Sequence, residues 1–175
     1  ALECLGVTGC AALTSLPDSI GQCTSLVELW CIGSGLTSLP SSIGGCVALE
    51  VLDVSGCQQL TALPREIRGC TSLEVLLCSE NGLKSLPLEL GLLPNLEKLY
   101  CHRLKLEDEE MAAFVGYSDK MIAHLRKRAQ AELTGRLTKR ALPTRDAGSA
   151  ASEAGGDDDA SGAAGPPPGK VGREG

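Results

Sequence analysis

Leucines recur at a fixed spacing along the first hundred residues of the chain. The segments LTSLP, LTSLP, LTALP and LKSLP begin at residues 13, 36, 60 and 83, at intervals of 23, 24 and 23 residues. Each unit also contains Leu-x-x-Leu-x-(Val/Cys), whose alternation of apolar and variable residues is typical of a β-strand. A turn pair such as Ser34-Gly35 follows, and a proline that cannot donate to a strand ladder then ends the pairing. The pattern predicts a strand, a turn and a returning segment in every unit.

Four units are complete and a fifth has begun, with leading leucines at Leu2, Leu26, Leu49, Leu73 and Leu96. One unit cannot bury its own leucines, whereas stacked units form a continuous core. The units resemble the intracellular LPxxIG subclass of leucine-rich repeats, found in plant Ras-group proteins, Shoc2-like scaffolds and plant immune receptors. The sequence motif that begins at Gly9-Cys10 and at Gly56-Cys57 is most similar to the repeats of immune receptors. The resemblance covers residues 2 to about 104 and implies an α/β solenoid with a parallel concave sheet and short helical or irregular convex segments.

The apolar spacing becomes helical after residue 105. Gly116 is expected to divide two helices, acidic residues 107–110 suit the start of the first, and Ser118 can cap the second. We expect a repeat solenoid at 1–105, a helical C-terminal cap with a basic segment at 106–142, and a disordered Gly/Ala/Pro-rich tail at 143–175. The residues expected to pack the cap on the last repeat are Met111, Phe114, Val115, Met121, Ile122, Leu125, Ala129 and Leu133.

The charge pattern restricts the partners. The net charge of −6 argues against nucleic acid or an anionic membrane as the partner of the whole chain, and no apolar run is long enough to span a membrane. Residues 120–145, however, carry eight basic residues and one acidic residue. The clusters 126–128 and 139–140 fit a nuclear import signal, a lipid contact or an acidic partner, and they also fit a plain solvated helix face.

The nine cysteines do not indicate a metal cluster or a disulfide framework. Most of them take repeat positions that other units fill with Leu, Val or Asn, so we interpret them as reduced structural thiols, as in the cytosol or nucleus. Strand alternation directs Cys101 inward and His102 outward, so the two cannot share a metal. The GPPPGK segment lacks the spacing and the Ser/Thr of a P-loop. We expect no catalytic residue, no metal and no cofactor.

The third, fifth and seventh positions of each unit face outward and vary. Trp30 and Tyr100 share the fifth position, about 14 Å apart across three strand spacings. Exposed aromatic and aliphatic residues of this kind are typical of binding surfaces. Five short strands project only about 400 Å², against about 800 Å² per partner in a standard interface, so loops, the C-terminal helices or further repeats must contribute. The candidate partner-binding residues are Glu28, Trp30, Ile32, Val51, Asp53, Val75, Leu77, Lys98, Tyr100 and His102.

Together these features favour a non-catalytic protein-interaction module or scaffold in cytoplasmic signalling, with a nuclear location as the alternative. The expected partner is an unidentified protein, such as a small GTPase. The chain is expected to act as a monomer within a longer protein. It begins at Ala1, with neither an initiator Met nor a readable signal peptide, which favours a fragment. Two alternatives remain: the ligand-sensing repeats of a multidomain immune-type receptor, and an accessory domain of an enzyme. A P-loop upstream would favour the receptor, and more repeats would favour the scaffold.

Overall fold

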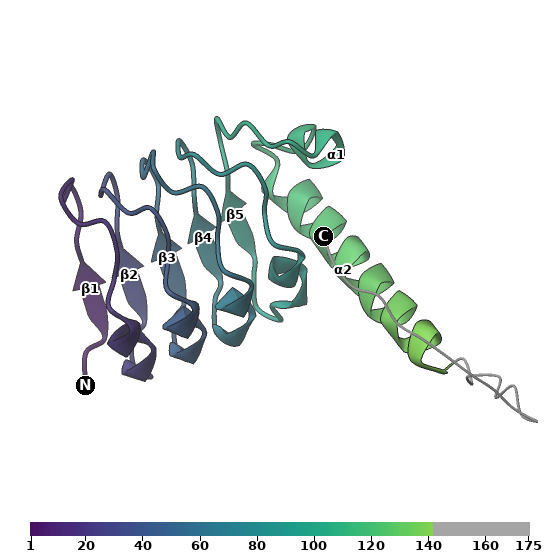
Figure 1. Cartoon of the computed structure of the whole chain (residues 1–175), viewed down its shortest axis with the longest axis horizontal. Coiled ribbons are helices and arrows are strands. Elements are labelled where there is room, and N and C mark those ends of the chain that lie inside the picture. Colours follow the sequence, from purple (N-terminus) through teal and green to yellow (C-terminus); the bar gives the residue numbers. More distant parts are fainter. Residues whose placement is uncertain (142–175) are drawn as a thin grey trace, which may run out of the picture. The chain divides into compact units, whose positions relative to one another are not determined.

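The computed structural model describes the backbone of residues 1–141 and the side chains of residues 1–136. Five three-residue strands form one parallel sheet, in which each strand pairs with the next one in the sequence (Figure 1). The register places the central leucines of neighbouring strands opposite one another, for example Leu29 opposite Leu52. The strands are β1 (Cys4–Gly6), β2 (Glu28–Trp30), β3 (Val51–Asp53), β4 (Val75–Leu77) and β5 (Lys98–Tyr100).

A five-residue 3₁₀ helix lies on the return path between each pair of successive strands, as the family resemblance implied for the convex side (Figure 1). A proline in extended conformation precedes each one, because its fixed φ and missing N–H suit a helix start. The helices stack so closely that a Cβ on Gly45 would lie 2.3 Å from the Gly21 carbonyl oxygen, so only glycine fits there. They are η1 (Asp18–Gln22), η2 (Ser41–Gly45), η3 (Arg65–Gly69) and η4 (Leu88–Leu92).

The core between the sheet and the 3₁₀ helices is built from leucine, isoleucine and cysteine. The leading leucines Leu26, Leu49 and Leu73 are fully buried. Cys46 and Cys70 are also fully buried, and each thiol donates to the carbonyl oxygen of an isoleucine in the preceding unit at 3.2 Å. These cysteines therefore act as small core residues, as expected from their repeat position.

Two helices, α1 (Glu109–Ala112) and α2 (Ser118–Ala141), follow the last strand, and α2 packs against η4 and β5 (Figure 1). Gly116, with φ of +88°, separates them as predicted. Arg126 donates to the Leu96 carbonyl oxygen at 3.0 Å. The Ser118 hydroxyl accepts the Leu99 N–H at 2.6 Å, so it bonds the edge strand β5 rather than capping its own helix as expected.

The cap differs from the sequence expectation at its far end. Met121 and Leu125 are fully buried, but Leu133 is 39% exposed and lines a small pocket with Leu88 and Leu92 of η4 instead of joining the core. No helix in the described part of the chain combines the length and the apolar character needed to cross a membrane. Residues 143–175, expected to form a disordered tail, lie outside the described residues, and so do the side chains of the cluster at 139–140.

An acid and an arginine fasten α1 to α2. The Asp108 carboxylate accepts the Met111 N–H at 3.0 Å, which caps α1, and it also accepts a hydrogen bond from Arg128. These bonds, that of Arg128 foremost, hold the pKa of Asp108 below its usual value. Two members of the basic cluster are thus engaged within the chain: Arg128 within the cap, and Arg126 at the last repeat.

Candidate functional site

The concave side of the sheet displays one continuous row of side chains. Strand alternation buries Leu29 and Cys31 and leaves Trp30 partly exposed on the other face. The register places Trp30 opposite Asp53, Asp53 opposite Leu77, and Leu77 opposite Tyr100. We call these four residues the central row. They come from four consecutive units, so the repeat itself brings them together.

The two aromatic residues of the central row are held in different ways. The Trp30 indole N–H donates to Glu28 Oε2 at 3.1 Å, and the Cys4 thiol donates to the same oxygen at 3.7 Å. Tyr100 is 38% exposed, and its ring centroid lies 6.4 Å from that of His102 with 28° between the planes. Glu28 therefore orders the indole before a partner arrives, which lowers the entropy lost on binding.

Asp53 departs from the prediction. The sequence places it among the outward contact residues, but only 5% of it is exposed. Its Oδ1 accepts the Ser55 N–H at 2.8 Å, so the carboxylate stabilises the turn after β3. Asp53 is a structural member of the central row and does not present a free charge to a partner.

The other predicted residues lie where the repeat places them. Ile32, Val51, Val75 and Leu77 are partly exposed on the concave side, and Lys98 and His102 are exposed. The structure thus assembles a mainly apolar strip with a cation and an imidazole at its C-terminal end. The predicted binding role of these residues stays a prediction.

A second row, which the sequence reading missed, crosses the sheet one residue before most of the strands. Backbone N–H groups donate from Val27 to Glu3, from Glu50 to Val27, from Glu74 to Glu50 and from Glu97 to Glu74, over 2.7 to 2.9 Å. The four glutamates are exposed. We call them the acidic row. Among the described side chains, none of the four forms an ion pair.

The turns after the strands form the edge of the concave face. The first three units use glycines with positive φ there, such as Gly33 and Gly56, whereas the last two use Glu80 and Arg103, with φ of 57° and 59°. A left-handed conformation is unfavourable for these residues by about 1–2 kcal/mol each. Arg103 Nη1 and Glu80 Oε1 are 2.9 Å apart, and this ion pair joins the two strained turns.

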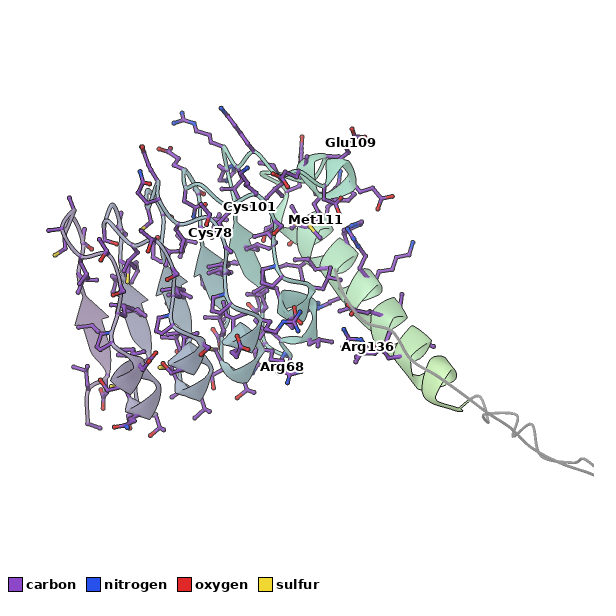
Figure 2. All side chains as sticks on the ribbon, viewed as in Figure 1. Arg68, Cys78, Cys101, Glu109, Met111 and Arg136 are labelled. Atoms are coloured by element: carbon purple, nitrogen blue, oxygen red, sulfur yellow. The ribbon has the colours of Figure 1, made fainter. Side chains whose placement is uncertain are left out.

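The cysteines of the last strands lie inside the solenoid. Figure 2 shows Cys78 and Cys101 at equivalent places in neighbouring units, and both are fully buried. Burial raises the pKa of the Cys101 thiol. His102 is exposed on the other face, so the pair is divided as predicted. Within residues 1–136, no group of three or more His, Cys, Asp or Glu is arranged to hold a metal ion.

The chain matches no family model and no curated protein. Among solved structures it is similar to a leucine-rich repeat protein of Leptospira interrogans, with 36% identity and a TM-score of 0.50. It is also similar to the leucine-rich repeat domain of the type III effector XopL, with 28% identity and a TM-score of 0.51. The fold is a leucine-rich repeat solenoid. These matches cover 57% and 60% of this chain, which spans only 26% and 36% of the two proteins.

A third similar structure is a chain from the BIR3–SERK2 complex of Arabidopsis thaliana, with 32% identity and a TM-score of 0.50. The match covers 59% of this solenoid chain and 58% of that chain. The comparisons establish the leucine-rich repeat fold. The LPxxIG subclass and the likeness to Shoc2-like scaffolds stay predictions.

In a leucine-rich repeat solenoid, residues that share a repeat position line up across the sheet. The acidic row could therefore have been found in the sequence by reading the second position of each unit, where Glu3, Val27, Glu50, Glu74 and Glu97 occur. Strand alternation alone assigns contacts to the third, fifth and seventh positions and passes over the second. The signal was present, and it consists of like charges at one register.

Proposed function

We propose that this solenoid is a non-catalytic protein-interaction module that binds a protein partner on its concave face. The central row carries the proposal. Trp30 and Tyr100 are of the residue types most enriched at binding hot spots, and Leu77 lies between them on β4, next to Tyr100. The hydrogen bond from Trp30 to Glu28 favours binding, because the ring needs little further ordering.

The partner is proposed to extend beyond the strands. The sheet alone offers about 400 Å², which is half of what one side of a standard interface buries. The turn edge at Glu80 and Arg103 adjoins the row and supplies paired charges for the polar rim that surrounds most hot spots. That a similar chain occurs in the BIR3–SERK2 complex supports a protein as the partner.

We place this module in cytoplasmic signalling, as a scaffold within a longer protein. A second candidate is the ligand-sensing part of a multidomain immune-type receptor, favoured by the sequence motif that begins at Gly9-Cys10 and at Gly56-Cys57. The two differ in what precedes the repeats: a P-loop domain supports the receptor, and further repeats support the scaffold. An accessory role within an enzyme would place catalysis outside these residues.

Affinity capture from the native cell, read by mass spectrometry, tests the proposal. The bait is the full chain, compared with a Trp30→Ala, Tyr100→Ala double variant whose fold is verified by circular dichroism. Tyr117→Ala is the control, because Tyr117 is 58% exposed but lies between α1 and α2. We expect a partner to be lost only with the double variant. Capture of every partner by the folded double variant would contradict binding through the central row.

A further inference from the structure

The acidic row lacks neutralising partners within the described side chains. Its members directly precede β1, β3, β4 and β5, and the uncharged Val27 takes the same position before β2. Neighbouring strands are about 4.8 Å apart. Glu28 adds a fifth carboxylate on β2. Like charges directly opposite one another on a sheet are destabilising. Lys98 is the only cation within strands β1 to β5, and it lies on the last of them.

The cations elsewhere in the described chain are largely engaged. Arg126 bonds the Leu96 carbonyl oxygen, and the ion pairs of the other arginines are Arg128 with Asp108, Arg136 with Glu132, and Arg103 with Glu80. None of these pairs involves the acidic row. Within residues 1–136 no cation pairs with the acidic row, so the row is open to the basic groups of a partner.

The two rows define the shape of that molecule. Glu50 immediately precedes β3 and Asp53 is the last residue of that strand, so the acidic row runs along the start of the sheet, about 10 Å from the central row. An α-helix with its side chains is about 10–12 Å wide, and residues at i and i+4 are about 5–6 Å apart, close to the strand spacing. A helix lying across the strands can thus reach both rows at once.

We propose that the concave face takes an amphipathic basic helix of the partner. Its lysines and arginines lie along the acidic row, and its apolar side chains pack on the central row between Trp30 and Tyr100. This inference rests on the proposed function, because it uses the same face. The cation at Lys98 repels the basic face, so the helix is expected to sit toward β2, β3 and β4.

The test is a fluorescence anisotropy titration of the full chain with a labelled 18-residue peptide of lysine and leucine, patterned so that a helix has one basic and one apolar face. A scrambled peptide of the same composition controls for charge alone. The variant Glu50→Gln, Glu74→Gln removes two carboxylates of the row. The matched control Glu66→Gln, Glu109→Gln removes two exposed carboxylates on η3 and α1, away from the concave face.

We expect the patterned peptide to bind more tightly than the scrambled one, with an affinity that falls as salt is added. The row variant should weaken binding by about 2- to 30-fold, the loss expected for two exposed ion pairs, and the control variant should leave it nearly unchanged. Equal losses in the two variants, or equal binding of the two peptides, would show attraction to net charge alone and would overturn the inference. Saturable binding of calcium chloride alone, lost in the row variant, would assign the row to a cation and also overturn it.

The same titration with the Trp30→Ala, Tyr100→Ala variant separates this inference from the proposed function. Weaker peptide binding there, together with the loss in the row variant, supports both rows as one site. If the peptide fails to bind while a native partner is still lost from the double variant in affinity capture, the partner is not a basic helix and only the inference is overturned. If the double variant affects neither binding nor capture, the central row is not a binding site, and the proposed function and the inference both fail.

Discussion

The contact between η4 and α2 gives a sharp stability prediction at Gly91. A Cβ at this position would lie 2.4 Å from the Leu125 carbonyl oxygen, 2.5 Å from the Leu125 carbonyl carbon and 2.7 Å from the backbone nitrogen of Arg126. Ordinary contacts begin near 3.4 Å, so Gly91→Ala must displace α2 by about 1 Å. Overpacking of this kind destabilises a protein by about 1–3 kcal/mol.

Urea unfolding followed by far-UV circular dichroism measures this effect. With a urea dependence of about 2 kcal/mol per molar, the midpoint should fall by about 0.5–1.5 M. Gly135→Ala is the control, because an added Cβ there meets nothing within 4 Å and alanine favours a helix by up to about 1 kcal/mol over glycine. The same substitution should therefore lower the free energy of unfolding at one site and raise or preserve it at the other.

Hydrogen exchange at one amide reports the displacement directly. The Leu99 N–H donates to the Ser118 hydroxyl, so moving α2 should weaken this bond and speed exchange at Leu99. An unchanged midpoint together with unchanged Leu99 protection in Gly91→Ala would refute the reasoning, because the tight contact would then not hold α2 in place.

Three further predictions concern the core and the cap. Leu76→Ala, at a fully buried position in β4, should lower the free energy of unfolding by about 2–5 kcal/mol in chemical denaturation, and a loss below 1 kcal/mol would show that the core collapses around the gap. Burial raises the pKa of the Cys31 thiol to about 12. Iodoacetamide at pH 8 should therefore label the exposed Cys4 first and Cys31 only on unfolding, as measured by mass spectrometry. Prompt labelling of Cys31 in the folded protein would contradict its burial. The hydrogen bond from Arg128 lowers the folded-state pKa of Asp108, so its stabilising effect is present above the unfolded value of about 3.9 and is lost as the pH falls through the lower folded value. Between pH 5 and pH 2, urea midpoints should therefore fall less in Asp108→Asn than in the parent chain, and parallel curves would exclude this contribution.

The strands and the core of this solenoid follow from the sequence because each of the five units carries leucines that must be buried at the same repeat positions. Leu29, Leu52 and Leu76 must be buried whichever unit they belong to, and the common spacing fixes their register across the sheet. The candidate contact positions follow by alternation. A periodic pattern thus predicts which face a residue lies on.

A periodic pattern does not predict which group a polar side chain forms a hydrogen bond with. Asp53 lies on the expected face, yet its carboxylate turns back to the Ser55 N–H. Ser118 begins α2 as expected, yet its hydroxyl accepts a hydrogen bond from β5 at the outer edge of the sheet, opposite the edge that pairs with β4. Leu133 continues the helical apolar spacing, but it lies at the mouth of a small pocket beside η4 and stays 39% exposed. Each of these outcomes depends on segments that meet only in the folded chain, so local spacing carried no signal for them.

Photo-crosslinking tests the location of the partner most directly. A benzoylphenylalanine placed at Leu77, in the middle of the central row, is compared in the native cell with the same group at Val47, which is 46% exposed in the segment after η2. Binding on the concave face predicts a crosslinked protein partner from position 77 and none from position 47. A partner crosslinked from position 47 alone would contradict it and would place the interaction away from the sheet.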